Sequence, residues 1–132
     1  MPITRIDPPQ LAASPNYAHV TITTAGRTAH VSGQVALDKV GGIVGKGDLR
    51  AQTVQVYENL KAALAAVGAD FHDVAKIVTF VVDITPDKVA ILREVRAKYF
   101  PADTKPASSM IGVTGLVHPD LLVEVEADAL LE

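Results

Sequence analysis

Two pairs of oxygen-bearing side chains in this sequence could take part in hydrolytic chemistry. Ser108 and Ser109 follow the segment Lys105-Pro106-Ala107, and Glu124 and Glu126 alternate with valines near the C-terminus. A serine becomes a nucleophile only beside a base, and the chain has neither a GxSxG elbow nor an SxxK motif. The serines are therefore expected to contact a ligand, cap the backbone or simply begin a strand. A carboxylate can act as a base toward water, although carboxylates on a half-buried strand are also commonly solvated.

Two other patterns in the sequence do not fit the spacing that phosphate or metal binding requires. The glycines of GGIVGKG do not form a phosphate loop, because Gly41 and Gly45 are separated by three residues and Gly47 follows Lys46. We interpret this segment as a flexible connection. The histidines show no metal-ligand spacing, so no metal site is predicted; they are His19, His30, His72 and His118. His19 and His30 are placed to face one another across a predicted hairpin, where ordinary polar strand positions are the alternative.

Composition restricts the class of protein. The 132 residues suggest one domain, residues 1–132, with residues 1–16 as an extended N-terminal arm rich in proline. Apolar residues make up 48% of the chain, which is rich for this size and indicates that some apolar surface is buried between copies. The net charge of −3 and the 5% aromatic content argue against a nucleic-acid surface. The chain has no cysteine, no apolar signal core and no run long enough to span a bilayer, so we expect a cytoplasmic protein without a membrane partner.

The hydrophobic pattern predicts the elements that must position these side chains. Residues 17–26 and 28–37 alternate around a turn at Ala25-Gly26-Arg27 and are predicted to form a β-hairpin. Residues 49–67 have helical spacing after the N-cap Asp48 and before Gly68. Residues 74–84 are apolar almost throughout, which is typical of a central strand covered on both faces.

The second half of the chain continues the alternation of helix and strand. Thr85-Pro86 begins a helix with an apolar stripe, and Pro101 is expected to end it. Residues 108–116 and 121–131 read as strands separated by a turn at His118-Pro119-Asp120, with Glu124, Glu126 and Asp128 on one strand face. This order predicts a two-layer α+β domain, in which two helices cover one face of a mixed sheet. The other face is expected to pack against further copies.

Several short motifs, taken in order, resemble those of the YjgF/RidA family, also called the L-PSP family. The match extends from about residue 14 to 130. The residues that carry it are Ser14-Pro15-Asn16-Tyr17, Val31-Ser32-Gly33-Gln34-Val35, Gln52 to Asn59-Leu60, Val81-Val82-Asp83, Lys105-Pro106-Ala107-Ser108-Ser109 and Val123-Glu124-Val125-Glu126-Ala127. The resemblance implies a chorismate-mutase-like fold and a homotrimer, in which the sheets form a central barrel and a small-molecule cleft lies at each subunit interface. It also implies hydrolysis of reactive enamines and imines to a 2-oxo acid and ammonia, without a cofactor.

The resemblance also assigns roles within the cleft. Tyr17 matches the tyrosine that lines it, Ser32 and Gly33 match its wall, and Glu124 matches the acid associated with the attacking water. The backbone of Met110 falls where the family offers hydrogen bonds to the ligand. Ser108 stands where the family motif has an arginine for the substrate carboxylate.

Ser108 is the departure from the family pattern, because a hydroxyl cannot form the two parallel charge-assisted bonds of a guanidinium. We expect Arg93 as the candidate replacement, with a solvent-facing helix position as the alternative, and Lys105 to point to solvent. Two hypotheses follow. One is an imine hydrolase with altered substrate choice, and the other is a non-catalytic metabolite-binding or regulatory trimer. A ribonuclease, an older label for the family, is disfavoured by the acidic charge.

Overall fold

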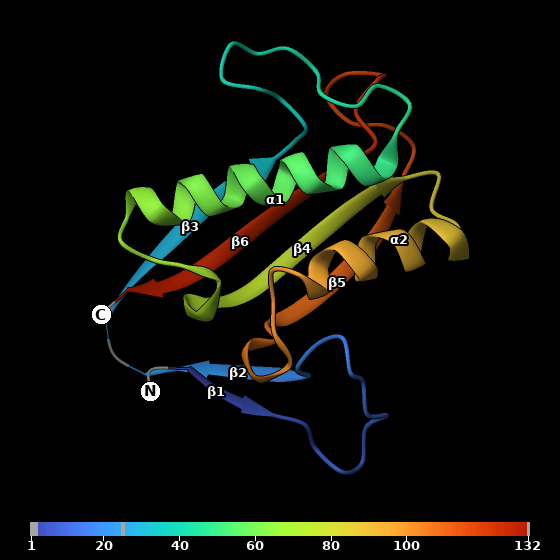
Figure 1. Ribbon diagram of the computed structural model, residues 1–132. Helices are drawn as coiled ribbons and strands as arrows, with labels where there is room; N and C mark the ends of the chain where they lie inside the picture. The colour runs from blue at the N-terminus through green and yellow to red at the C-terminus, as the bar shows by residue number, and fades with distance from the viewer. Residues whose placement is uncertain (1–2, 25, 132) are drawn as a thin grey trace.

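The computed structural model describes residues 3–24 and 26–131. Four strands form one sheet in the order β3-β6-β4-β5, and these are β3 (Arg27–Gln34), β6 (Val123–Leu131), β4 (Val74–Val82) and β5 (Ala107–Val113). The β3–β6 and β6–β4 pairs are antiparallel, whereas β4 and β5 run parallel. Helices α1 (Leu49–Ala66) and α2 (Pro86–Ala97) both lie on one face of the sheet (Figure 1). The predicted α+β fold with a mixed sheet is confirmed.

The helix starts follow the local signals in the sequence. The side chain of Asp48 accepts a hydrogen bond from the backbone N–H of Ala51, and that of Thr85 accepts one from Lys88. Each cap satisfies a donor that the helix itself leaves free. The end of α2 differs from the prediction, since the helix ends at Ala97 and Pro101 instead precedes the short 3-10 turn η2 (Ala102–Thr104).

The N-terminal region corrects two predictions. Residues Ile3–Ile6 form strand β1, which pairs antiparallel with β2 (Val20–Thr23), so the arm is not free of regular structure. The predicted hairpin between residues 17–26 and 28–37 is wrong, because β3 pairs with β6 instead. Ala25, in the predicted turn, lies outside the described residues. Pairing with β6 lets the helix-facing side chains of β3 join the main core, a gain that the short strand β2 does not offer.

The two faces of the sheet have different surroundings. Under the helices, Ile77 and Val81 of β4 pack in a buried cluster with Leu60 of α1 and Leu92 of α2. Full burial of each such side chain stabilises the fold by roughly 1.5–3 kcal/mol. On the opposite face, Ile3 of β1 packs against Ala75 at the start of β4, whereas residues further along the strand, such as Phe80, are only partly covered. Within the described residues, the predicted second cover of β4 is therefore present only at its start.

The segment between β3 and α1 is a looped connection rather than a phosphate site. The Asp38 carboxylate accepts hydrogen bonds from the N–H groups of Val40 and Gly42, at 3.0 and 2.8 Å. The carboxylate of Asp48 occupies the N-terminus of α1, where a phosphate would have to bind. Among residues 3–24 and 26–131, no helix is both long and apolar enough to cross a membrane.

Candidate functional site

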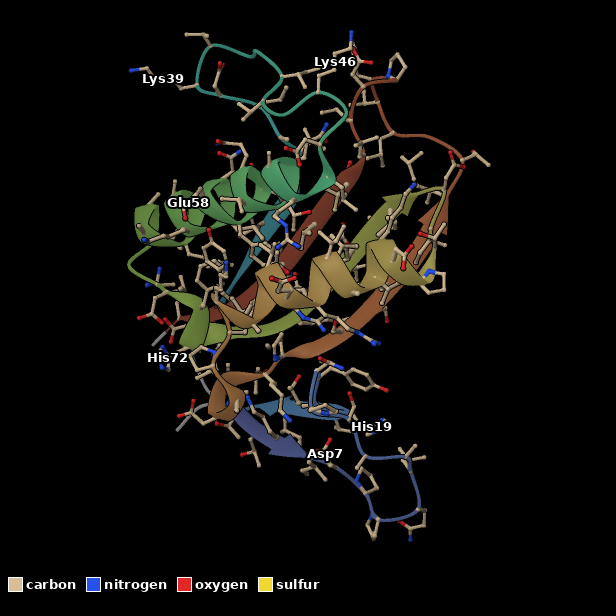
Figure 2. The ribbon with its side chains drawn as sticks, turned by 45° about the vertical axis from the view of Figure 1, so that its right-hand side comes forward. Asp7, His19, Lys39, Lys46, Glu58 and His72 are labelled. Atoms are coloured by element: carbon tan, nitrogen blue, oxygen red, sulfur yellow. The ribbon has the colours of Figure 1, made fainter. Side chains whose placement is uncertain are left out.

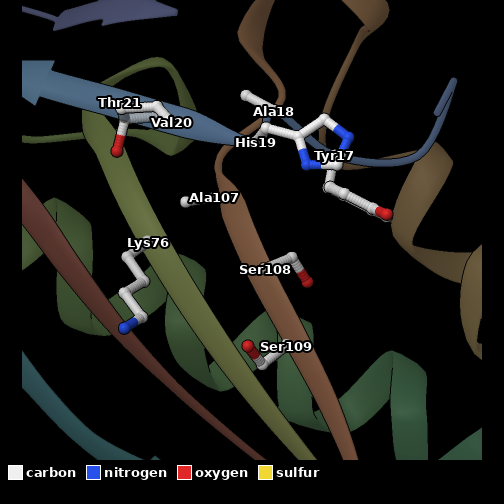
Figure 3. A pocket seen from close by; sticks show the side chains of 9 residues that line it. All are labelled: Tyr17, Ala18, His19, Val20, Thr21, Lys76, Ala107, Ser108 and Ser109. Carbon is white, nitrogen blue, oxygen red and sulfur yellow. The ribbon is translucent and has the colours of Figure 1, made fainter. Parts of the chain in front are cut away.

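A hollow of about 410 Å³ lies where the chain entering β2 approaches the starts of β4 and β5. Figure 3 shows Tyr17 and Ser108 at one side of this hollow and Lys76 at the other. Its lining residues are Tyr17, Ala18, His19, Val20, Thr21, Lys76, Ala107, Ser108 and Ser109. We call this space the main hollow.

Tyr17 is held in place from both sides. Its neighbour Ala18 donates a backbone hydrogen bond to the Pro106 carbonyl at 3.1 Å, which ties the segment to the start of β5. The ring of His19 packs edge-on against the Tyr17 ring, with 5.2 Å between centroids and an interplanar angle of 79°, a favourable aromatic geometry. The His19 ring nitrogen in turn lies 2.6 Å from the Ala12 carbonyl. His19, which sequence reasoning left as an ordinary strand residue, thus helps to orient Tyr17.

The two serines point to opposite sides of β5, as Figure 3 shows and as strand geometry requires. Ser108 is half-buried, and its hydroxyl oxygen accepts a hydrogen bond from Arg96 Nη1 at 3.2 Å. Ser109 is exposed. Within the described chain, neither serine forms a hydrogen bond with a base.

Arg96, on the last turn of α2, is the residue that sequence reasoning missed. Only 6% of it is exposed. Burial lowers the pKa of its guanidinium, and nearby Arg93 acts in the same direction. A signal was present, since Arg96 follows Leu92 by four residues and precedes Tyr99 by three, which places it on the apolar stripe of the helix.

A second cavity, of about 40 Å³, lies beside Arg96, and we call it the cationic cavity. Arg93 and Lys105 line it together with Arg96, and Pro15 and Asn16 form its other wall. Arg93 itself is an exposed residue. The expectation that Lys105 points to solvent is wrong, because Lys105 is half-buried and its Nζ donates to the Ser14 carbonyl at 3.3 Å.

Met110 lies two residues after Ser108 on the edge strand β5. The Pro106 carbonyl points away from β4, since it accepts the Ala18 N–H. The two-residue period of a strand places the backbone groups of Ser108 and Met110 on that same free edge. The side chain of Met110 packs against the core under the helices, so only its backbone is placed to meet a ligand.

Glu124 meets the β3 strand at an irregularity. The pairing of β3 with β6 shifts register between Val31 and Gln34, and Ser32 and Gly33 occupy this bulge. Gly33 lies so close to the Glu124 carboxylate that a side chain there would overlap it, whereas Ser32 is exposed. Within the described part of the chain, no group donates a hydrogen bond to the half-buried carboxylate of Glu124.

One chain does not bring all the predicted site residues together. Ser108 pairs with Ile77, on the face of the sheet that the helices cover. Glu124 pairs with Phe80, on the opposite face and two strands away from β5. Tyr17 and Ser108 line the main hollow, Arg93 lines the cationic cavity, and Ser32, Gly33 and Glu124 form a separate group.

The ionisable residues outside these groups are dispersed. In Figure 2, Asp7 and His19 lie at the end of the molecule that holds β1 and β2, and Lys39 and Lys46 lie on the loop at the opposite end. His30 faces Asp128, with 2.7 Å between Nδ1 and Oδ1, so it does not face His19 as the predicted hairpin required. In the stretch that the structure covers, no three histidines or acids are grouped to hold a metal ion.

Comparison with protein families places these features in context. The family model described as Endoribonuclease L-PSP matches residues 8–131. A RutC family protein of Pyrococcus horikoshii is 39% identical over 108 residues, which cover 82% of each chain.

Solved structures agree with the sequence matches. A protein of the conserved Rid family from Yersinia pestis, YyfB, has a TM-score of 0.93 and 40% identity, and the match covers 99% of this chain and 100% of that one. A member of the YjgF family from Mycobacterium tuberculosis has a TM-score of 0.68 and 31% identity, with 87% and 86% of the two chains covered.

Proposed function

Because this chain belongs to the YjgF/RidA family, we propose that it hydrolyses small reactive imines to a carbonyl compound and ammonia, without a cofactor. Family membership rests on the matched model over residues 8–131 and on relatives near 40% identity. The observation that carries the proposal further is the surroundings of the Glu124 carboxylate. No group within the described residues donates a hydrogen bond to it, and the lack of a side chain on Gly33 leaves room for it. Such a carboxylate is free to accept a proton.

In the proposed reaction, Glu124 acts as a general base and then as a general acid. It removes a proton from water while the water oxygen bonds to the imine carbon, which gives a carbon that bears both a hydroxyl and an amino group. The proton taken from water passes to the nitrogen and completes the amino group. Glu124 then transfers the hydroxyl proton to the same nitrogen, the carbon–nitrogen bond breaks with its electron pair on ammonia, and the oxygen forms the carbonyl. The atoms balance as one imine plus one water to one carbonyl compound plus one ammonia.

We further propose that the working unit is a homotrimer with its clefts between subunits. The side chains of Glu124 and Ser108 lie on opposite faces of one sheet. A cleft between two copies provides a way for both groups to reach one ligand. Exposed apolar side chains on the uncovered face, such as Ile111, support burial against another copy.

The test is a hydrolysis assay on 2-imino acids generated in the cuvette by an amino-acid oxidase. Formation of the 2-oxo acid is compared with the uncatalysed rate for the wild type, Glu124→Gln and Glu126→Gln. Removal of a general base typically lowers the rate by about 10²- to 10⁴-fold, and this loss is expected for Glu124→Gln alone. Glu126 lies two residues along β6 and controls for the loss of a carboxylate from the strand.

Ser108→Arg is a third variant in the same assay. If the wild type is inert and Ser108→Arg is active, the hydrolytic groups are intact and the natural substrate lacks a carboxylate at this position. If the wild type is already active, another cation holds the carboxylate. Saturable metabolite binding without product in every variant favours the alternative function, a non-catalytic metabolite-binding or regulatory trimer.

A ribonuclease is the less favoured activity, although the matched family model has that description. RNA affinity depends on many cations that contact phosphates, and this chain carries a net charge of −3. The cations that do gather line a cavity of only about 40 Å³. RNA cleavage that weakens with added salt and disappears in Glu124→Gln would make ribonuclease the favoured activity.

A further inference from the structure

We propose that the cationic cavity binds the carboxylate group of a small ligand, with Arg96 as its main donor and Ser108 as the residue that positions Arg96. The inference rests on the proposed function only in taking the main hollow as the place where the rest of the ligand lies. Three cationic residues, Arg93, Arg96 and Lys105, line this cavity, and none of its lining residues is acidic. The site is thus built for an anion.

Arg96 lacks an internal counter-ion. No carboxylate lies within 4.0 Å of its nitrogens in the part of the chain that the structure describes, and its guanidinium donates a hydrogen bond to Ser108. A guanidinium has five N–H donors in a fixed plane. A buried charge without a partner is costly, and only 6% of Arg96 is exposed to solvent. An incoming anion would offset that cost.

Ser108 connects the cationic cavity to the main hollow. Arg96 lines the first space and Ser108 lines the second, and the 3.2 Å hydrogen bond joins them. Because the serine oxygen accepts from Arg96, its own hydroxyl proton remains available to a ligand. A molecule with its carboxylate at Arg96 would therefore extend past Ser108 toward Tyr17.

The shape and size favour a carboxylate over larger anions. The cavity volume of about 40 Å³ suits a group of two or three heavy atoms better than a tetrahedral phosphate with its hydration shell. The planar fork of a guanidinium matches the two oxygens of a carboxylate. Arg96 on α2 would then provide the carboxylate contact that the serine at position 108 on β5 cannot provide.

The test uses propionate, with neutral propionamide as an isosteric control and inorganic phosphate as the competing anion. The Arg96 Nε–H signal is followed by NMR during each titration of the full chain. We expect saturable propionate binding that shifts this signal, and no binding of propionamide. Loss of the guanidinium in Arg96→Met is expected to weaken binding by about thirtyfold or more, whereas Arg93→Met, at an exposed position of the same helix, has a smaller effect.

Two more variants keep the test independent of folding. Arg96→Lys retains the charge but loses the bidentate fork, and Ser108→Ala removes the positioning contact together with the hydroxyl donor. Both should bind propionate more weakly than the wild type while remaining folded. Equal propionate affinity in the wild type and Arg96→Met, or tight phosphate binding without propionate binding, would overturn the assignment. If imines are hydrolysed with the same KM by the wild type and Arg96→Met, the carboxylate site fails and the hydrolase stands. If propionate binds as expected but no imine is hydrolysed, the carboxylate site stands and the proposed hydrolase activity fails.

Discussion

At the scale of single residues, the contact between Gly33 and Glu124 shows how a backbone position can control a functional side chain. The Glu124 carboxylate occupies the space that a Cβ on Gly33 would fill. The carboxylate is the far end of a flexible, half-buried side chain, so it can move aside at little cost. Glycine at residue 33 therefore matters more for where the Glu124 carboxylate lies than for the free energy of unfolding.

We predict that Gly33→Ala displaces the Glu124 carboxylate and changes the free energy of unfolding by less than about 1 kcal/mol. Imine hydrolysis should fall as far as it does in Glu124→Gln. Gly26→Ala is the matched control, because Gly26 has φ = +102° and a Cβ there would overlap the backbone carbonyl of Leu131. That substitution should cost roughly 1–2 kcal/mol or more. Equal losses of stability in urea denaturation would contradict the distinction.

At the scale of elements, Gln52 joins three segments. Its side-chain nitrogen donates to the carbonyls of Gly45 and Asp120, at 3.2 and 2.8 Å. Its oxygen accepts the N–H of Leu122 at 2.9 Å. This fully buried amide on α1 thus fixes the loop before the helix and the entry to β6, the strand that carries Glu124.

Replacement of Gln52 by leucine should destabilise the fold by about 2–5 kcal/mol, since three buried backbone groups would lose their partner. The change is expected as a lower urea midpoint with an unchanged slope. Lys61→Leu, on the exposed side of the same helix, serves as the control and should stay within about 0.5 kcal/mol. A tolerated Gln52→Leu would mean that the loops satisfy their own hydrogen bonds.

Helix α1 is also linked to the turn that follows α2, through Glu58 and Tyr99. The Tyr99 hydroxyl donates to the Glu58 carboxylate at 2.7 Å. Burial and this hydrogen bond to the carboxylate raise the pKa of Tyr99 from 10.0 to about 12. The stabilising contribution is therefore fully present below pH 10 and is lost as the pH rises from about 10 to 12.

We predict that the free energy of unfolding falls more steeply between pH 10 and 12 in the wild type than in Tyr99→Phe, because only the wild type must ionise this phenol on unfolding. Burial also raises the pKa of Tyr57, so a part of the slope should persist in the variant. Urea denaturation at several alkaline pH values measures both curves. Parallel curves would show that Tyr99 ionises in the folded protein as easily as in the unfolded chain.

At the scale of the whole molecule, the face of the sheet opposite the helices is covered within the described residues only at one end, where Ile3 of β1 packs against Ala75 and Leu130. Apolar and acidic side chains alternate across it, with Ile111 43% exposed beside half-buried Phe80. Burial of this face between copies would remove the apolar surface and bring Glu124 into an enclosed space. The apolar content of 48% fits such an assembly.

Sedimentation equilibrium should give three times the mass of one chain for the wild type. Ile111→Glu places an unpaired charge on the proposed interface and should produce monomers. Val117→Glu introduces the same charge in a loop where the side chain is 88% exposed, and it should leave the trimer intact. A monomeric wild type, or a trimeric Ile111→Glu, would remove the interface cleft from the proposed function.

The sequence alone determined the elements whose signals are local. Asp48 and Thr85 mark the starts of the helices, because the cap hydrogen bonds form within one turn. The alternation around Glu124 predicts both the strand β6 and the shared face of its acids, and both are observed. The central position of β4 likewise follows from its continuous apolar run.

Only the tertiary structure decided which distant segments meet. The pairing of β3 with β6 rather than β2 depends on the burial available in the whole sheet, which no local turn signal encodes. For the same reason the sequence drew attention to Arg93, whereas the packing of α2 against β5 brings Arg96 to Ser108. Hydrogen bonds between near neighbours can be read from residue order, but contacts between layers depend on how all the apolar faces are buried together.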